Sequence, residues 1–136
     1  MKILVDANIA LDVLLKRHPF YITGTQILGL SKGGIDLFIS ATTITDIYYI
    51  VQKILKDQNA TMCLLKNLLE SVQIASVNDS EIRRAIVLGW DDFEDAVQYA
   101  TGENIAVDYL VTRNTTDYNS VAFPVVTPDE LLNIIT

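Results

Sequence analysis

Five short apolar runs alternate with longer segments whose apolar residues recur at helical spacing. The runs lack the strict alternation of apolar and polar residues that a half-exposed strand shows, which is typical of strands covered on both faces of a sheet. They span residues 2–5, 36–40, 73–77, 107–112 and 121–126. The helical segments span residues 7–17, 20–34, 41–56, 60–71, 78–89, 91–104 and 127–135. This order predicts an α/β domain in which helices flank a central, mostly parallel sheet of short strands.

The chain is expected to form one domain over residues 1–136. Its 136 residues match an ordinary domain, and half of them are hydrophobic, so it can bury a sizeable core. No apolar run approaches the roughly 18 residues of a membrane span. Asp6 and Asp12 interrupt the apolar N-terminal stretch, unlike in a signal peptide. We therefore expect a cytoplasmic protein with no membrane segment.

Composition excludes several kinds of functional site. The chain has one cysteine, Cys63, and one histidine, His18. It therefore forms no internal disulfide, and its single histidine nearly rules out a histidine-rich zinc site or a Ser-His-Asp triad. The formal net charge is −7 and the pI is near 4.4, whereas proteins that bind nucleic acid by charge alone are usually basic. If this protein handles nucleic acid, metal ions must offset its acidic side chains.

Four aspartates stand just after predicted strands or in the first turns of helices that leave the sheet. Asp6 follows the first strand, Asp46 lies in the second turn of the helix after the second strand, and Asp117 follows the strand at 107–112. Asp95 lies near the start of the helix at 91–104. Because ligands of parallel sheets bind beyond the carboxyl ends of the strands, we expect these four side chains to converge there.

Each acidic residue also has a purely structural interpretation. Asp6 is equally well placed to cap the helix that follows it. Asp92 and Glu94 suit the N-terminal end of their helix as cap and dipole partners, and Asp117 suits a turn. Asp46, among isoleucines and tyrosines, is harder to explain in this way. Taken together, the aspartates predict a cation site, because gathered carboxylates repel one another without a cation.

Oxygen ligands without histidine or cysteine favour Mg²⁺ or Mn²⁺. Sites of this kind commonly serve phosphoryl chemistry, in which the metal activates a water and neutralises charge on the phosphate. The sequence thus indicates a metal-dependent enzyme that acts on a phosphate ester.

Four motifs in this order resemble those of PIN-domain ribonucleases, in particular the VapC-like toxins of bacterial toxin–antitoxin pairs. The motifs are LVDANIALDVLL, TITDIYYIVQKIL, DFEDAVQYA and LVTRNTTDY, and the resemblance runs from Met1 to about Leu131. It implies a three-layer PIN-like fold and a Mg²⁺- or Mn²⁺-dependent endoribonuclease. Its substrate would be single-stranded or looped RNA, with tRNA among the candidates. It also implies an antitoxin protein as partner.

The resemblance assigns roles to individual residues. Asp6, Asp46 and Asp95 match the first three acids of the family. For the fourth position Asn114 and Asp117 compete, and we favour Asp117 as the acid with Asn114 as its polar neighbour. Asp6, Asp95 and Asp117 would hold the metal, and Asp46 would complete the cluster and orient the attacking water.

Two departures from the family pattern and several secondary residues complete the predicted site. Asp46 replaces the usual glutamate and is one methylene shorter, and Ala7 replaces a common serine or threonine. Arg113 could contact the scissile phosphate or could be a solvated loop residue. Asn8 and Asp92 are secondary candidates for the site. The lysines of the third helix, Lys53 and Lys56, either follow the RNA backbone or are simply solvated.

Two other classes of function compete with the nuclease. A non-catalytic PIN-like module that binds RNA or protein would explain the overall acidity, but it would not need all four acids. A phosphate-accepting receiver domain would need a lysine after a late strand, where the chain has Arg113.

The segments 44–55 and 61–69 carry more apolar surface than a small domain is expected to bury. We therefore expect a homodimer, the commonest symmetric assembly. Members of the PIN-domain family that the sequence resembles also form homodimers.

Overall fold

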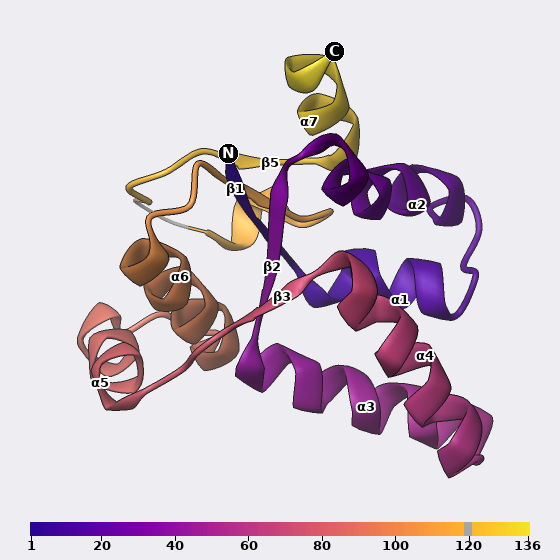
Figure 1. The fold of residues 1–136 in the computed structure, drawn as a ribbon. Helices are drawn as coiled ribbons and strands as arrows, with labels where there is room; N and C mark the ends of the chain where they lie inside the picture. Colours follow the sequence, from indigo (N-terminus) through magenta and orange to yellow (C-terminus); the bar gives the residue numbers. More distant parts are fainter. Residues whose placement is uncertain (119–120) are drawn as a thin grey trace.

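The computed structural model describes residues 1–118 and 121–136, and its centre is a five-stranded sheet in the order β3-β2-β1-β4-β5 (Figure 1). Each neighbouring pair of strands is parallel. The strands are β1 (Lys2–Val5), β2 (Asp36–Ser40), β3 (Gln73–Ala75), β4 (Tyr109–Val111) and β5 (Val125–Val126). The predicted parallel sheet of short strands is therefore confirmed.

Seven α-helices and two short 3₁₀ turns accompany the strands in the described residues. The helices are α1 (Ala7–Leu14), α2 (Tyr21–Gly29), α3 (Ala41–Leu55), α4 (Gln58–Ser71), α5 (Asp79–Leu88), α6 (Phe93–Ile105) and α7 (Pro128–Ile135). The 3₁₀ turns are η1 (Leu30–Gly33) and η2 (Thr115–Asp117). No helix within residues 1–118 and 121–136 combines the length and the apolar character needed to cross a membrane.

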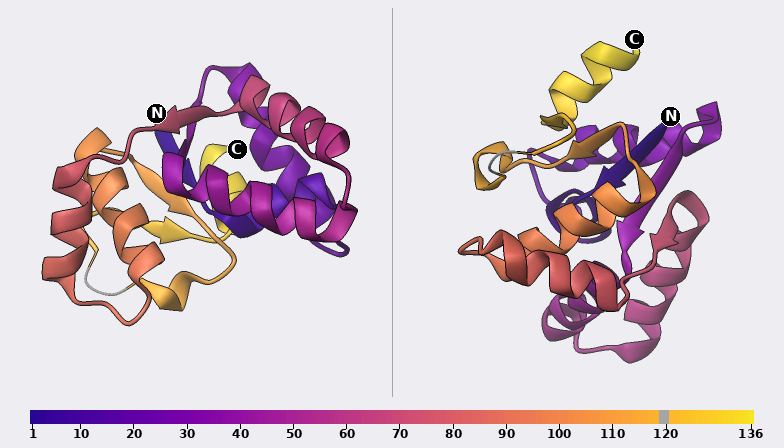
Figure 2. Two further views of the ribbon diagram at one scale, coloured as in Figure 1. Left: turned by 90° about the horizontal axis from the view of Figure 1, so that it is seen from below. Right: turned by 90° about the vertical axis from the view of Figure 1, so that its left-hand side faces the viewer.

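The sheet separates two layers of helices, as predicted. Ile3 and Val5 of β1 belong to a core shared with α1, α3 and α4, whereas Leu4 packs with Tyr99 of α6 on the other face. Figure 2 shows α5 and α6 on one side of the sheet and α1, α3 and α4 on the other. Since both faces are covered, every residue of the run from Ile3 to Val5 is buried, which explains the absence of a two-residue period.

Two predicted helices end earlier than the sequence suggested. The helix expected over 7–17 stops at Leu14, and Lys16 adopts a left-handed conformation with φ of 51°. The segment expected to be one helix over 20–34 is divided into α2 and η1. Gly34 then ends η1 with φ of 86°, a left-handed value that glycine adopts without steric cost.

The register of the sheet places the ends of β1 and β4 side by side. Val5 pairs with Val111, and the amide of Asp6 donates to the carbonyl oxygen of Val111 at 3.0 Å. Helix α6 approaches β1 closely at Gly102, where an added Cβ would lie 3.1 Å from a methyl carbon of Leu4. This packing carries the N-terminal half of α6 to the same edge of the sheet.

Candidate active site

Asp6 stands at the end of the central strand and accepts hydrogen bonds from four donors. Its Oδ1 accepts from the amide of Ala7 at 2.7 Å and from Nε2 of Gln98 at 3.1 Å. Its Oδ2 accepts from Oγ1 of Thr112 at 2.6 Å and from Nδ2 of Asn8 at 3.2 Å. Asp6 is therefore the N-cap of α1 and also the centre of a polar cluster, so its two predicted roles are compatible.

Asp95 is half-buried in the first turn of α6, and its pKa is raised to about 7. Burial is the largest cause of this raised pKa, because it disfavours the ionised carboxylate. Three neighbouring carboxylates add to the effect by charge repulsion, those of Asp92, Asp6 and Asp117. The hydroxyl of Tyr118 opposes it by donating to Oδ1 of Asp95 at 3.3 Å. The charges of Asp6 and Asp117 therefore both act on Asp95.

Asp117 and Asn114 occupy the two ends of the turn that contains η2. Both are exposed, and the amide of Asn114 donates to Oγ1 of Thr112 at 3.1 Å. Of the two residues, Asp117 is the one whose charge raises the pKa of Asp95. This favours Asp117 as the fourth acid and leaves Asn114 as its polar neighbour.

Asp46 acts on the pKa of Glu94. From the sequence, Glu94 is assigned only to the N-terminal end of its helix. Burial raises the pKa of Glu94 to about 7, followed by a hydrogen bond with Asp46 and by the charges of Asp46, Asp92 and Asp95. Asp46 on α3 is thus linked to the remaining acids through α6. Glu94 extends the predicted acidic cluster.

The two secondary candidates have different roles. Asn8 lies in the first turn of α1 and donates to Asp6, and its Oδ1 accepts from the amide of Arg113 at 3.4 Å. Asp92 is the N-cap of α6, where its Oδ1 accepts from the amide of Asp95 at 3.0 Å. Asp92 is therefore the predicted helix cap, and its charge also acts on the site.

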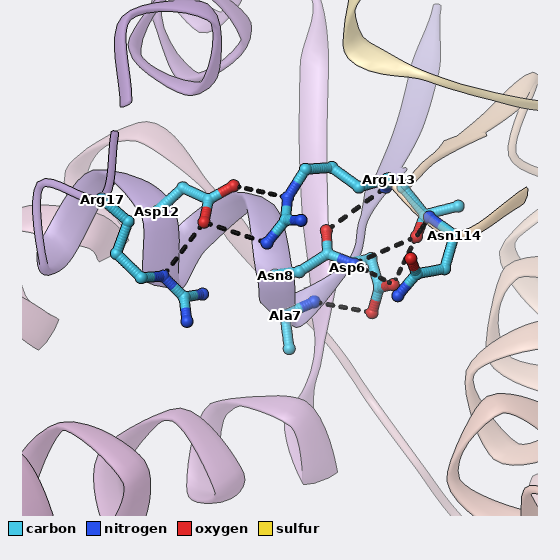
Figure 3. Close-up of polar contacts among 8 residues, drawn as sticks. Asp6, Ala7, Asn8, Asp12, Arg17, Arg113 and Asn114 are labelled. Carbon is cyan, nitrogen blue, oxygen red and sulfur yellow. Dashed lines mark hydrogen bonds and ion pairs between the residues drawn. The ribbon is translucent and has the colours of Figure 1, made fainter. Parts of the chain in front are cut away.

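Arg113 is bound to a buried carboxylate instead of being solvated. Its guanidinium donates to both oxygens of Asp12, at 2.8 and 3.2 Å, and lies 3.9 Å from the centre of the Phe20 ring. Asp12 is 1% exposed and forms a second ion pair with Arg17 at 3.0 Å. Figure 3 shows the Arg113 side chain reaching from beside Asp6 along α1 toward Asp12. The interpretation of Arg113 as a solvated loop residue is therefore wrong.

Five residues of this region were not singled out for these roles in the sequence: Asp12, Glu94, Gln98, Thr112 and Tyr118. Thr112 offered the clearest signal, because it follows β4 as Asp6 follows β1. Gln98 is the one amide within the run Ala96–Ala100, which is otherwise apolar apart from the tyrosine hydroxyl. For Asp12 the signal was a carboxylate on the apolar side of a short helix.

The donors present fit Mg²⁺ or Mn²⁺ in chemistry, since they are carboxylate, amide and hydroxyl oxygens. Among residues 1–118 and 121–136, no three Asp, Glu, His or Cys side chains lie close enough to form a complete ligand set. This spacing is compatible with Mg²⁺, which is commonly held by one or two carboxylates and retains several waters. After burial, the charges of three nearby carboxylates raise the pKa of Asp95, and a cation would offset this repulsion.

Comparison with known proteins gives one family. The family model described as PIN domain matches residues 2–116. Ribonuclease VapC1 of Aquifex aeolicus (strain VF5) is 27% identical over 137 residues, covering 95% of this chain and 92% of that protein. The family match contains every predicted site residue except Asp117, which is the first residue after the matched segment.

Solved structures share the fold. VapBC2 from Rickettsia felis, solved with a DNA fragment from its promoter, matches with a TM-score of 0.73 and 16% identity, covering 93% of this chain and 98% of that chain. A toxin–antitoxin complex from Klebsiella pneumoniae matches with a TM-score of 0.67 and 25% identity, covering 92% and 96%. The predicted three-layer fold is confirmed by these similarities.

Proposed function

Because the chain belongs to the PIN-domain family, we propose that it is a metal-dependent endoribonuclease and the toxin of a toxin–antitoxin pair. The proposal extends to this chain the activity in the name of its relative, Ribonuclease VapC1. The substrate is single-stranded or looped RNA. The antitoxin is a second protein, by analogy with the toxin–antitoxin complexes that share the fold.

One observation carries the catalytic part of this proposal. The pKa of Asp95 on α6 is raised to about 7 by burial first and by Asp92 next, and the charges of Asp6 and Asp117, from two segments that follow parallel strands, add to it. Acids from three distant parts of the chain thus lie near the carboxyl edge of the sheet, although among residues 1–118 and 121–136 no three are close enough to hold an ion without water. Without a cation this arrangement is unfavourable, so we assign it to metal binding.

In the proposed site Asp6, Asp95 and Asp117 hold Mg²⁺ or Mn²⁺, directly or through water. The chemistry that such an ion would supply is that of a Lewis acid, which would lower the pKa of a bound water. Glu94, with a pKa near neutrality and in contact with Asp46, is suited to accept a proton from the attacking water. Through that contact the shorter Asp46 takes part in orienting the water.

Two polar residues and the metal would allow this acidic protein to bind RNA. Arg113 and Asn114 follow β4 beside Asp6, and we propose that they contact the substrate at the mouth of the site. Arg113 would do so while Asp12 fixes its guanidinium. The metal and these groups together offset the negative charge of the site, which would otherwise repel the phosphate backbone.

The experiment that tests the proposed function is cleavage of total RNA by the purified protein with Mn²⁺, followed by mapping of new 5′ ends. We expect discrete cleavage sites that disappear when EDTA removes the metal. Asp95→Asn should reduce cleavage by at least about a hundredfold, since it removes a charge that the metal needs. Asp6→Asn is a poorer test, because its amide would place a donor against the donors of Gln98 and Asn8.

Asp108→Asn provides the matched control. Asp108 lies at the opposite edge of the sheet, before β4, and its carboxylate accepts from the amide of Lys2 at 2.8 Å. This variant should cleave like the wild type. Cleavage that survives both EDTA and Asp95→Asn would refute the proposed site, and RNA that binds without being cut would favour the non-catalytic module.

A further inference from the structure

Gln98 is a polar side chain in the buried part of α6. It is 2% exposed and lies one turn after Asp95, between Val97 and Tyr99, which are also buried. A buried amide without partners would destabilise the fold, so its hydrogen bonds show what the surrounding structure requires of it. All of its partners in the described structure lie in or around the acidic cluster or at the start of α3.

The hydrogen bonds of Gln98 use both ends of its amide. Nε2 donates to Oδ1 of Asp6 at 3.1 Å and to the hydroxyl oxygen of Tyr118 at 2.6 Å. Oε1 accepts from Oγ1 of Thr43 at 3.4 Å. An ionised Asp6 has no hydrogen to donate, so the amide group that faces it must be the NH₂ end. Thr43 fixes this orientation from the opposite side.

Tyr118 carries the connection from Gln98 to Asp95. Its hydroxyl accepts from Gln98 and donates to Oδ1 of Asp95 at 3.3 Å. The ring is 8% exposed and packs against Trp90 and in the core on the α6 side of the sheet. A continuous hydrogen-bonded path therefore joins the carboxylates of Asp6, just after β1, and Asp95, in α6.

We infer that Gln98 is a positioning residue for the metal site, and that together with Tyr118 it holds the carboxylates of Asp6 and Asp95 in the orientation that binds the cation. This inference rests on the proposed function, because it assigns Gln98 to the same site. Like charges on these two residues would otherwise separate them before a metal arrives. Hydrogen bonds to ligating side chains typically change metal affinity by about 10–100-fold.

Gln98→Met is the direct test, because methionine keeps the length and bulk of the side chain and removes both hydrogen-bonding groups. The measurement is Mn²⁺ affinity of metal-free protein by calorimetric titration. We expect affinity to fall by about 10–100-fold, while the metal-free variant stays folded with a melting temperature at or below the wild-type value. Excess Mn²⁺ should restore RNA cleavage, which a general folding defect would not allow. Unchanged Mn²⁺ affinity would overturn the inference.

Tyr118→Phe tests the other half of the path without disturbing the packing of the ring, and it serves also if Gln98→Met fails to fold. It should weaken Mn²⁺ binding, and its effect should shrink when Gln98 is already methionine, because the two residues act in one path. Full additivity of the two losses would show that they act separately and would overturn the shared role.

Gln52→Met is the matched control. Gln52 lies toward the end of α3, and its Oε1 accepts from the buried Thr61 at 2.8 Å. This variant should bind Mn²⁺ like the wild type, and equal losses of affinity in both glutamine variants would overturn the role of Gln98.

The wild-type titration separates the proposed metal site from the role of Gln98. No Mn²⁺ binding at all would refute both, whereas binding unaffected by Gln98→Met would refute only the role of Gln98.

Discussion

Asp95 links the chemistry of the site to the stability of the fold. Its pKa is raised to about 7 in the metal-free native state by burial and by nearby carboxylates, whereas an aspartate in an unfolded chain titrates near 3.9. Between these values the native protein binds more protons at this residue than the unfolded protein does. The stability that depends on Asp95 is therefore complete below about pH 4 and is lost as the pH rises through about 7.

The first prediction follows from this sign. In EDTA, the wild-type melting temperature should fall between pH 5 and pH 8, and Asp95→Asn should remove part of that fall. The variant should be the more stable of the two at pH 8, because the ionised carboxylate of Asp95 is unfavourable in the native state, by an amount that solvent screening at this half-buried position reduces. Thermal unfolding followed by circular dichroism at several pH values measures this. Parallel pH profiles for the two proteins would contradict it, and Asp108→Asn serves as the control at an exposed position.

A second residue-scale prediction concerns the buried Asp12. Arg113→Met removes one of its two guanidinium partners and leaves Arg17 as the other. Loss of one partner of a buried pair costs about 3–5 kcal/mol, and the remaining arginine should reduce this to about 1–3 kcal/mol of unfolding free energy. Urea denaturation measures the difference.

Arg83→Met is the matched control for this comparison. Arg83 pairs with Asp79 at 2.8 Å, but both side chains are more than three-quarters exposed. Its loss should change the free energy of unfolding by less than about 1 kcal/mol. Equal losses of unfolding free energy in the two variants would show that the buried pair of Asp12 and Arg113 stabilises the fold no more than an exposed pair does.

At the scale of elements, the order of strands and helices could be read from apolar periodicity, and the strand at 36–40 was placed at its observed bounds. Asp6 was predictable because it ends such a strand. Long-range hydrogen bonds were not, since Gln98 and Asp6 are far apart in the chain and meet only through packing. The same holds for Asp12 and Arg113, whose pairing depends on how the segment after β4 lies along α1.

The third prediction tests how α6 is held against the sheet. An added Cβ at Gly102 would lie 2.9 Å from Cζ of Phe123 and 3.1 Å from Leu4. Both neighbours are buried, so Gly102→Ala should destabilise the protein by about 1–3 kcal/mol despite the better helix propensity of alanine. Displacement of α6 should also weaken Mn²⁺ binding, because Asp95 and Gln98 lie on this helix. Urea denaturation and calorimetric titration measure the two effects.

Gly29→Ala is the control for this prediction. An added Cβ there has no described heavy atom within 4 Å, and Gly29 ends α2 with φ of −67°. Alanine should therefore be neutral or stabilise by up to about 1 kcal/mol. If Gly102→Ala behaved in the same way, the contact between α6 and β1 would be looser than the structure indicates.

At the scale of the whole molecule, apolar side chains remain exposed on the two helices that lie along one side of the molecule, α3 and α4 (Figure 1). Tyr49 and Ile54 of α3 are 70% and 59% exposed, and Met62 and Leu69 of α4 are also exposed. Where such side chains form one patch, they usually mark a protein interface. This exposure agrees with the sequence-based expectation that segments 44–55 and 61–69 pair with a second copy.

The fourth prediction is that the protein is a homodimer through this α3–α4 surface. Light scattering at tens of micromolar should give twice the mass of the chain, and Ile54→Lys should give the mass of a monomer, because a buried unpaired charge opposes association. Val87→Lys is the matched control, since Val87 of α5 is 76% exposed but lies on the other side of the sheet. Both substitutions are at exposed positions and should leave the fold intact. A monomeric wild type would refute the dimer, whereas a monomer produced only by Val87→Lys would move the interface to α5.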